Sequence, residues 1–206
     1  MKDRMKSQER VKLETTGTLS EREKTLWRRL LRDARSIAQR EHLMKTWGGW
    51  SYQVHIDRTD DVLVDFGYGD DTLFGFQRRV AMQFHDMIED CGWTYNDVKE
   101  FVKNAIGTIC DSHIAIADIA YALTDEKGRN RGQRKPDKLY KAMAKDRDFV
   151  VCKLADRVVN RERAGSMGQK YDKEYPGFRK KLYKKGMCDN MWNYLDELHS
   201  FKEKKK

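Results

Sequence analysis

The stretch Phe84-His85-Asp86-Met87-Ile88-Glu89-Asp90 combines apolar packing residues with four closely spaced ionisable side chains. We expect residues 80–90 to form one helix, with Glu89 one turn after His85 and Asp90 one turn after Asp86. A histidine beside an aspartate can ligate a divalent ion through an imidazole nitrogen and a carboxylate oxygen. The following Glu-Asp pair can orient or deprotonate a water at such an ion. The alternative is a surface helix with a chance His-Asp pair.

The composition indicates one mostly helical globular domain. The chain has 206 residues, of which 36% are charged, 39% are hydrophobic and only 2 are prolines. No apolar run approaches the ~18 residues of a membrane span, so we expect no membrane association. Residues 1–14 are charged and lack the apolar segment of a secretory signal. The 4 cysteines form no CxxC pair, and we expect reduced thiols in a cytoplasmic protein.

The formal net charge of +9 favours polyanionic partners, which include nucleic acids, phosphorylated small molecules and anionic surfaces. A basic nucleic-acid-binding module is therefore an alternative from a different functional class. Such a module would bind DNA or RNA in a salt-dependent way and would need no metal.

Helical spacing of apolar residues recurs along most of the chain after a loose lead-in at residues 1–18. Ser20 and Glu23 form a capping-box pattern, and Thr94 with Asp97 forms another. We expect helices at about residues 20–38, 94–106, 109–123, 137–145, 149–163 and 187–198, with Asp148 capping the fifth. Residues 62–64 form either a short strand or a helical turn. The Gly-Gly pair between Trp47 and Trp50 predicts a tight loop.

Candidate metal ligands stand at separate points of the chain: His55, His85, Asp86 and Asp156. Two imidazoles and two carboxylates make a mixed nitrogen and oxygen set that suits Mn²⁺, Fe²⁺ or a similar ion. Asp156 falls at the edge of a buried helical stripe, where a carboxylate needs a counter-charge. That charge comes either from a metal or from a salt bridge to Lys153 or Arg157. We expect His113 to be a packed or surface histidine instead of a ligand.

A basic segment at residues 124–136 contains Arg129 and Arg131 together with glycines and a proline. Its composition predicts a loop. The loop is either a solvated linker or a phosphate-binding segment over the site, because arginine pairs well with phosphate oxygens.

The order of the candidate ligands, H…HD…D, resembles that of the HD phosphohydrolase superfamily. The opening stretch is similar to the LLHDxxEDT motif of the Rel/SpoT hydrolase domain. Three other segments resemble that family's VTDxK, xKLADRxxN and PYxxHP motifs: residues 123–127 (LTDEK), 152–160 (CKLADRVVN) and 52–55 (YQVH). The resemblance covers roughly residues 30–165.

This resemblance implies an all-α fold, an HD-domain helical bundle with a central metal site. Together with the apolar pattern along the chain, it gives three expected parts: the loose lead-in 1–18, the HD phosphohydrolase domain 19–165, and a C-terminal segment 166–206. We expect that last segment to be polar, to end in a helix, and to pack on the same domain.

The activity implied is that of a stand-alone small alarmone hydrolase, which removes pyrophosphate from the ribose 3′ position of (p)ppGpp to give GDP or GTP. By resemblance, the four candidate ligands bind Mn²⁺, with Fe²⁺ or Mg²⁺ as alternatives, and Glu89 and Asp90 handle the attacking water. Lys45 and Asn160 contact the nucleotide, and the loop arginines Arg129 and Arg131 bind its phosphates. The expected partner is a nucleotide with a 3′-pyrophosphate, not nucleic acid, and a homo-oligomer is possible.

Departures from the family pattern leave the substrate open. Ile56 follows His55 where the family has proline, and Trp47 and Trp50 stand where the family is less aromatic. The base can therefore be guanine or adenine. Two rival functions are that of an HD enzyme acting on dNTPs, nucleoside monophosphates or cyclic nucleotides, and that of an inactive scaffold that sequesters a nucleotide.

Overall fold

The structure is a computed structural model that describes residues 17–125, 137–163 and 168–200. Its described part is almost entirely helical, so the predicted all-α fold class is confirmed. The only strands among these residues form one short antiparallel ribbon. None of the described helices is long and apolar enough to cross a lipid bilayer.

The described elements follow one another in chain order. They are α2 (Glu21–Glu41), β1 (Thr46–Trp47), β2 (Trp50–Ser51), α3 (Tyr52–Asp65), α4 (Leu73–Phe84), α5 (Met87–Asp90), α6 (Tyr95–Ile106), the 3-10 turn η1 (Ile109–Asp111), α7 (Ser112–Leu123), α9 (Asp137–Met143), α10 (Arg147–Glu162), α11 (Gly168–Leu182) and α12 (Asp189–Leu198). Residues 62–64 lie inside α3, so the helical alternative for them is the correct one.

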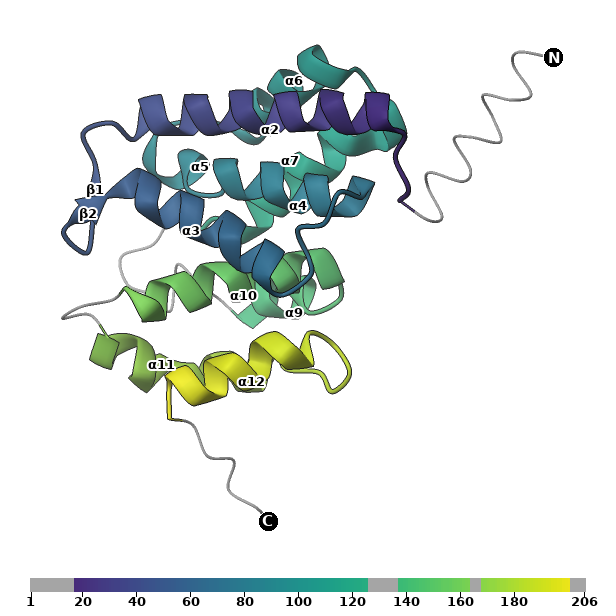
Figure 1. Ribbon diagram of the computed structural model, residues 1–206. Coiled ribbons are helices and arrows are strands. Elements are labelled where there is room, and N and C mark those ends of the chain that lie inside the picture. The colour runs from purple at the N-terminus through teal and green to yellow at the C-terminus, as the bar shows by residue number, and fades with distance from the viewer. Residues whose placement is uncertain (1–16, 126–136, 164–167, 201–206) are drawn as a thin grey trace.

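The helices stack in layers, as Figure 1 shows. α2 lies along one side and packs on α4 and α6, while α7 packs on both α4 and α6. α10 lies against α3 and α7 on the other side of α4, and α11 and α12 cover the far face of α10. Helices α3, α4 and α10 therefore adjoin one another although they are far apart in sequence.

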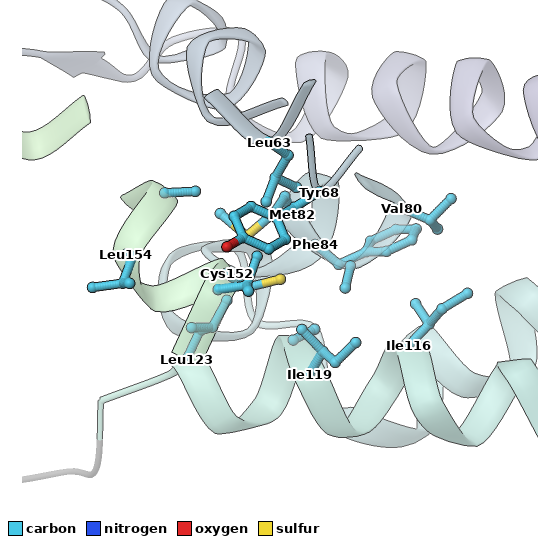
Figure 2. Close-up of a cluster of buried hydrophobic side chains, with 14 of the residues drawn as sticks. Leu63, Tyr68, Val80, Met82, Phe84, Ile116, Ile119, Leu123, Cys152 and Leu154 are labelled. Carbon is cyan, nitrogen blue, oxygen red and sulfur yellow. The ribbon is translucent and has the colours of Figure 1, made fainter. Parts of the chain in front are cut away.

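A hydrophobic core joins these layers. Figure 2 shows some of its side chains, among them Leu63 of α3, Met82 and Phe84 of α4, Ile119 of α7 and Leu154 of α10, and all five are buried. Each such side chain contributes about 1.5–3 kcal/mol when it leaves water. Because Phe84 immediately precedes His85, this packing also determines where the His-Asp pair lies.

Both predicted capping boxes are confirmed. The Ser20 hydroxyl accepts from the Glu23 amide while the Glu23 carboxylate accepts from the Ser20 amide, and Thr94 and Asp97 repeat the arrangement. The predicted cap at Asp148 is wrong. Asp146 caps α10 by accepting from the amides of Asp148 and Phe149, because the Asp148 carboxylate instead accepts from the Arg78 guanidinium at 2.8 Å.

The prediction of one continuous helix over residues 80–90 is also wrong. α4 ends at Phe84 and α5 begins at Met87. The carbonyl of Met82, which the Asp86 amide would meet in a continuing helix, instead contacts the His85 ring at 2.7 Å from Nδ1. A side chain that competes for a backbone carbonyl in this way ends the helical ladder. The Asp90 amide still donates to the Asp86 carbonyl at 2.8 Å, so these two residues remain one turn apart.

Candidate metal centre

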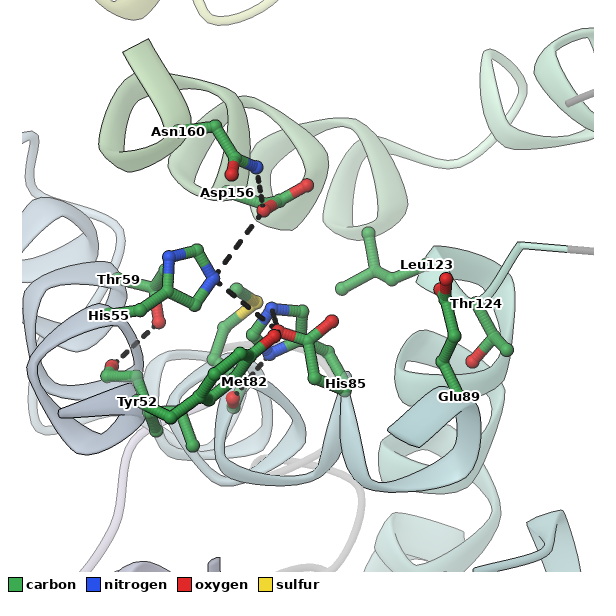
Figure 3. Close-up of polar contacts among 12 residues, drawn as sticks. Tyr52, His55, Thr59, Met82, His85, Glu89, Leu123, Thr124, Asp156 and Asn160 are labelled. Atoms are coloured by element: carbon green, nitrogen blue, oxygen red, sulfur yellow. Dashed lines mark hydrogen bonds and ion pairs between the residues drawn. The ribbon is translucent and has the colours of Figure 1, made fainter. Parts of the chain in front are cut away.

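Three separate elements bring the predicted ligands together. His55 lies in the first turn of α3, His85 and Asp86 form the turn between α4 and α5, and Asp156 lies in the middle of α10. Figure 3 shows the side chains of His55, His85 and Asp156 pointing toward one another. One ligand atom from each of His55, His85 and Asp86 lies within 4.8 Å of the other two.

A single carboxylate oxygen, Oδ2 of Asp86, lies close to both imidazoles. It is 2.9 Å from Nε2 of His85 and 3.4 Å from Nε2 of His55. The same His55 nitrogen is 3.7 Å from Oδ1 of Asp156. Asp156 is thus adjacent to the compact His-His-Asp group and contacts it through His55.

The donor chemistry of the histidines fits a divalent cation. His85 directs Nδ1 at the Met82 carbonyl, so Nδ1 carries a proton and Nε2 faces the centre of the cluster. Among the described residues, the buried Nδ1 of His55 has no hydrogen-bond partner, and the buried Nε2 of His85 makes no well-aligned hydrogen bond although Oδ2 of Asp86 lies 2.9 Å away. Imidazole nitrogens and carboxylate oxygens at this spacing are ligands for Mn²⁺, Fe²⁺ and related ions.

The electrostatics of the cluster favour positive charge at its centre. Burial lowers the pKa of His85, but the Asp86 carboxylate, with Asp156 beyond it, outweighs burial and raises that pKa to about 9. Burial raises the pKa of Asp86, yet His85 and His55 hold it well below its usual range. Both carboxylates therefore stay ionised in a buried setting, where a nearby cation compensates them.

Asp156 has further polar partners on its own helix. Its Oδ2 lies 2.9 Å from the Lys153 ammonium, and its Oδ1 accepts a hydrogen bond from the Asn160 amide. Burial raises the pKa of Asp156, but Lys153 and the two histidines bring it below its usual range. Of the two salt-bridge partners expected from the sequence, Lys153 makes the contact, whereas Arg157 lies 3.5 Å from Glu174.

Tyr52 belongs to the site although sequence reasoning assigned it no role. Its hydroxyl donates to Oδ2 of Asp86 at 2.7 Å, and its ring stacks on His42 with centroids 4.5 Å apart. Burial and the nearby Asp86 raise the pKa of Tyr52, so its hydroxyl remains a donor. The sequence signal was the spacing, since Tyr52 precedes His55 by three residues and so shares its helical face.

The residues predicted to act around the ligands lie at the edge of the cluster. Glu89 and Asp90 are exposed in α5, and an oxygen of Glu89 accepts from the Asp125 amide at 3.2 Å. Figure 3 shows Glu89 beside Thr124. The Lys45 ammonium contacts the Asp90 carbonyl and lies 3.3 Å from Sγ of Cys91.

The structure places the remaining residues singled out in the sequence in three different ways. Asn160 lies one turn after Asp156 and is bonded to it. Arg129 and Arg131 lie outside the described residues. His113 is buried in α7 and takes no part in the His-His-Asp group.

Comparison with known proteins places the fold. No protein-family model matches the chain. Among solved structures, the chain is similar to a metazoan ortholog of SpoT that hydrolyses ppGpp. The two chains are 18% identical, the match covers 83% of this chain and 94% of the other, and the TM-score is 0.64. At this identity the match establishes the path of the backbone: the chain has the all-α HD-domain fold of that SpoT ortholog.

Proposed function

We propose that this protein is a metal-dependent phosphohydrolase that removes the 3′-pyrophosphate of a purine alarmone such as (p)ppGpp, releasing GDP or GTP and pyrophosphate. The observation that carries the proposal is the meeting of His55, His85 and Asp86, with Asp156 adjacent, inside this fold. The similar solved protein hydrolyses ppGpp, which supports the choice of substrate class.

The four ligands would hold one divalent cation, with Mn²⁺ as the first candidate and Fe²⁺ or Mg²⁺ as alternatives. When bound, such a cation would lower the pKa of a water molecule and would neutralise charge on a phosphoryl oxygen. Tyr52 fixes the Asp86 carboxylate from one side, and the Met82 carbonyl fixes the tautomer of His85. Such outer contacts orient the ligands before any cation arrives.

Glu89 and Asp90 would orient the attacking water and accept its proton. Their exposure at the edge of the buried cluster supports this role, because a substrate has to reach them from solvent. The oxygen of the water bonds to the phosphorus next to the ribose, the bond to the 3′ oxygen breaks, and that oxygen leaves with a proton. Lys45 beside Asp90 offers positive charge to the phosphates.

Product analysis tests the proposal. Purified protein with Mn²⁺ is incubated with ppGpp, pppGpp, ppApp, dNTPs and cyclic nucleotides, and the Asp86→Ala variant is run beside it. Asp118→Ala is the matched control, because Asp118 also accepts a tyrosine hydroxyl, that of Tyr95 at 3.0 Å, but lies in α7 outside the cluster. We expect pyrophosphate release from 3′-pyrophosphorylated nucleotides by the wild type and by Asp118→Ala, and none by Asp86→Ala.

The remaining outcomes separate the rival functions. Turnover of a dNTP or cyclic nucleotide alone would retain the HD chemistry and reject the alarmone substrate. No turnover of any nucleotide would reject the enzymatic assignment and favour nucleotide sequestration or nucleic-acid binding. Full activity of the Asp86→Ala variant would instead reject the His-His-Asp cluster as the site of hydrolysis.

A further inference from the structure

A short β-ribbon carries two tryptophans into the neighbourhood of the metal centre. Trp47 of β1 pairs directly with Trp50 of β2, and Gly48 and Gly49 form the turn between them. Both glycines have positive φ, +56° and +87°, as a two-residue type I′ turn requires. Residues that pair across such a turn project to the same face of the ribbon. The ribbon thus presents both indole rings on one side.

Both ends of the ribbon lie close to elements that carry predicted ligands: its open end adjoins α3, and its turn adjoins the C-terminal end of α10. Ser51 of β2 immediately precedes α3, and the Trp47 ring centre lies 5.0 Å from that of His55. At the turn, a Cβ atom added to Gly48 would lie 2.9 Å from the carbonyl oxygen of Arg163, which directly follows α10. The ribbon therefore spans from one predicted ligand to the end of the helix that carries Asp156.

Trp50 is unusually exposed for its type. Its side chain is 55% exposed, whereas Trp27 and Trp192 in the core are fully buried. The Arg163 guanidinium lies over the Trp50 ring at 5.7 Å from its centre. Within residues 17–125, 137–163 and 168–200, no carboxylate forms an ion pair with Arg163. An open indole ring and an unneutralised guanidinium thus lie together beside the metal centre.

We propose that Trp50 stacks on the base of the nucleotide and, with Arg163 beside it, makes the site selective for purines over pyrimidines. This inference rests on the proposed function and names the residue that determines its base preference. Stacking depends on ring area and does not read hydrogen-bonding edges, because every base presents a π face. Guanine and adenine nucleotides should therefore bind about equally well, and the smaller pyrimidines should bind less tightly.

The size of the effect follows from known stacking energies. Loss of one base-stacking aromatic weakens binding by roughly tenfold or more. The loss should appear in Kd and KM, with kcat nearly unchanged, because Trp50 would contact the base and not the reacting phosphorus.

Calorimetric titration with ppGpp, ppApp and ppUpp, the uridine counterpart, tests the inference. The protein carries Glu89→Gln to prevent turnover and is loaded with Mn²⁺. Trp50→Leu removes the π face while keeping apolar bulk, and Trp50→Phe restores a smaller ring. Tyr183→Leu is the matched control. Tyr183 is also an exposed aromatic residue, at 36%, and the Arg179 guanidinium lies over its ring at 4.0 Å from the centre, but it lies on the connection between α11 and α12.

We expect Trp50→Leu to weaken both purine nucleotides about tenfold and to abolish their advantage over ppUpp. Trp50→Phe should recover part of the affinity, and Tyr183→Leu should change nothing. KM is measured separately in proteins that keep Glu89. An unchanged Kd in the titration, together with an unchanged KM when Trp50→Leu is the only substitution, overturns the inference while leaving alarmone hydrolysis intact. Purine binding that depends on Trp50, without any turnover by the wild type, supports the inference and rejects the proposed function. Absence of binding by any of the three nucleotides overturns both.

Discussion

Lys153 and Asp156 form a buried ion pair on one turn of α10, with 2.9 Å between Nζ and Oδ2. Only 7% of the Lys153 side chain and 11% of the Asp156 side chain are exposed. Removing one partner of such a pair leaves an uncompensated buried charge. The pair therefore links the stability of α10 to the charge of the His-His-Asp cluster, which Asp156 contacts through His55.

The Lys153→Met variant should lower the free energy of unfolding by about 3 kcal/mol in urea denaturation without metal. Mn²⁺ should stabilise this variant more than the wild type, because the cation then supplies the charge that Asp156 has lost. The control is Lys24→Met, which removes the exposed Lys24–Glu21 pair and should cost less than about 1 kcal/mol. Equal effects of the two substitutions would contradict this account.

Mn²⁺ should raise the thermal stability of the protein, and this rise should require the proposed ligands His85 and Asp86. Saturating Mn²⁺ at about 100 times Kd stabilises a folded protein by about 2.7 kcal/mol. We expect a corresponding rise in Tm for the wild type and for the Asp118→Ala control, reversed by EDTA. His85→Ala and Asp86→Ala should show no rise while retaining helical circular dichroism. A normal Mn²⁺ response in either variant would remove that residue from the ligand set.

The features that were predicted correctly from the sequence depend on interactions between residues that lie close together in the chain. The capping boxes at Ser20 and Thr94 involve residues three positions apart, and helical periodicity located most of the helices. The proximity of His55, His85 and Asp86 was expected through their resemblance to a motif. Spacing alone could not have brought His55 to the other two, because His55 lies in α3 whereas His85 and Asp86 lie in the turn between α4 and α5.

The features that sequence reasoning missed have identifiable physical causes. The break between α4 and α5 depends on the His85 ring competing for the Met82 carbonyl, which no propensity scale describes. Residues 168–182 were expected to be a polar segment, but they form α11. Its buried stripe includes Tyr171, Tyr175, Phe178 and Leu182, and the many lysines and Pro176 hide this helical period in the sequence.

Tyr52→Phe should weaken the metal centre while leaving the fold intact. The substitution removes the hydroxyl that donates to Asp86 Oδ2 at 2.7 Å and keeps the ring that stacks on His42. Loss of an outer contact of this kind typically lowers metal affinity or activity about 10- to 100-fold. Competition with a chromogenic chelator measures the Mn²⁺ affinity directly. The matched control is Tyr95→Phe, which removes the equivalent contact to Asp118, and equal affinities in the two variants would rule out the role of Tyr52.

Gly75→Ala should destabilise the protein because of a close backbone approach in the first turn of α4. An added Cβ atom would lie 2.1 Å from the Asp70 carbonyl oxygen and 2.4 Å from its carboxylate, so the backbone before α4 would have to move. Overpacking of this kind costs about 1–3 kcal/mol.

Gly177→Ala is the opposite case, since nothing lies within 4 Å of its added Cβ, and alanine favours the α11 helix by up to about 1 kcal/mol. Urea denaturation should therefore move the two midpoints in opposite directions. A Gly75→Ala midpoint at or above that of the wild type would show that the backbone around Asp70 moves to admit the added Cβ without loss of stability.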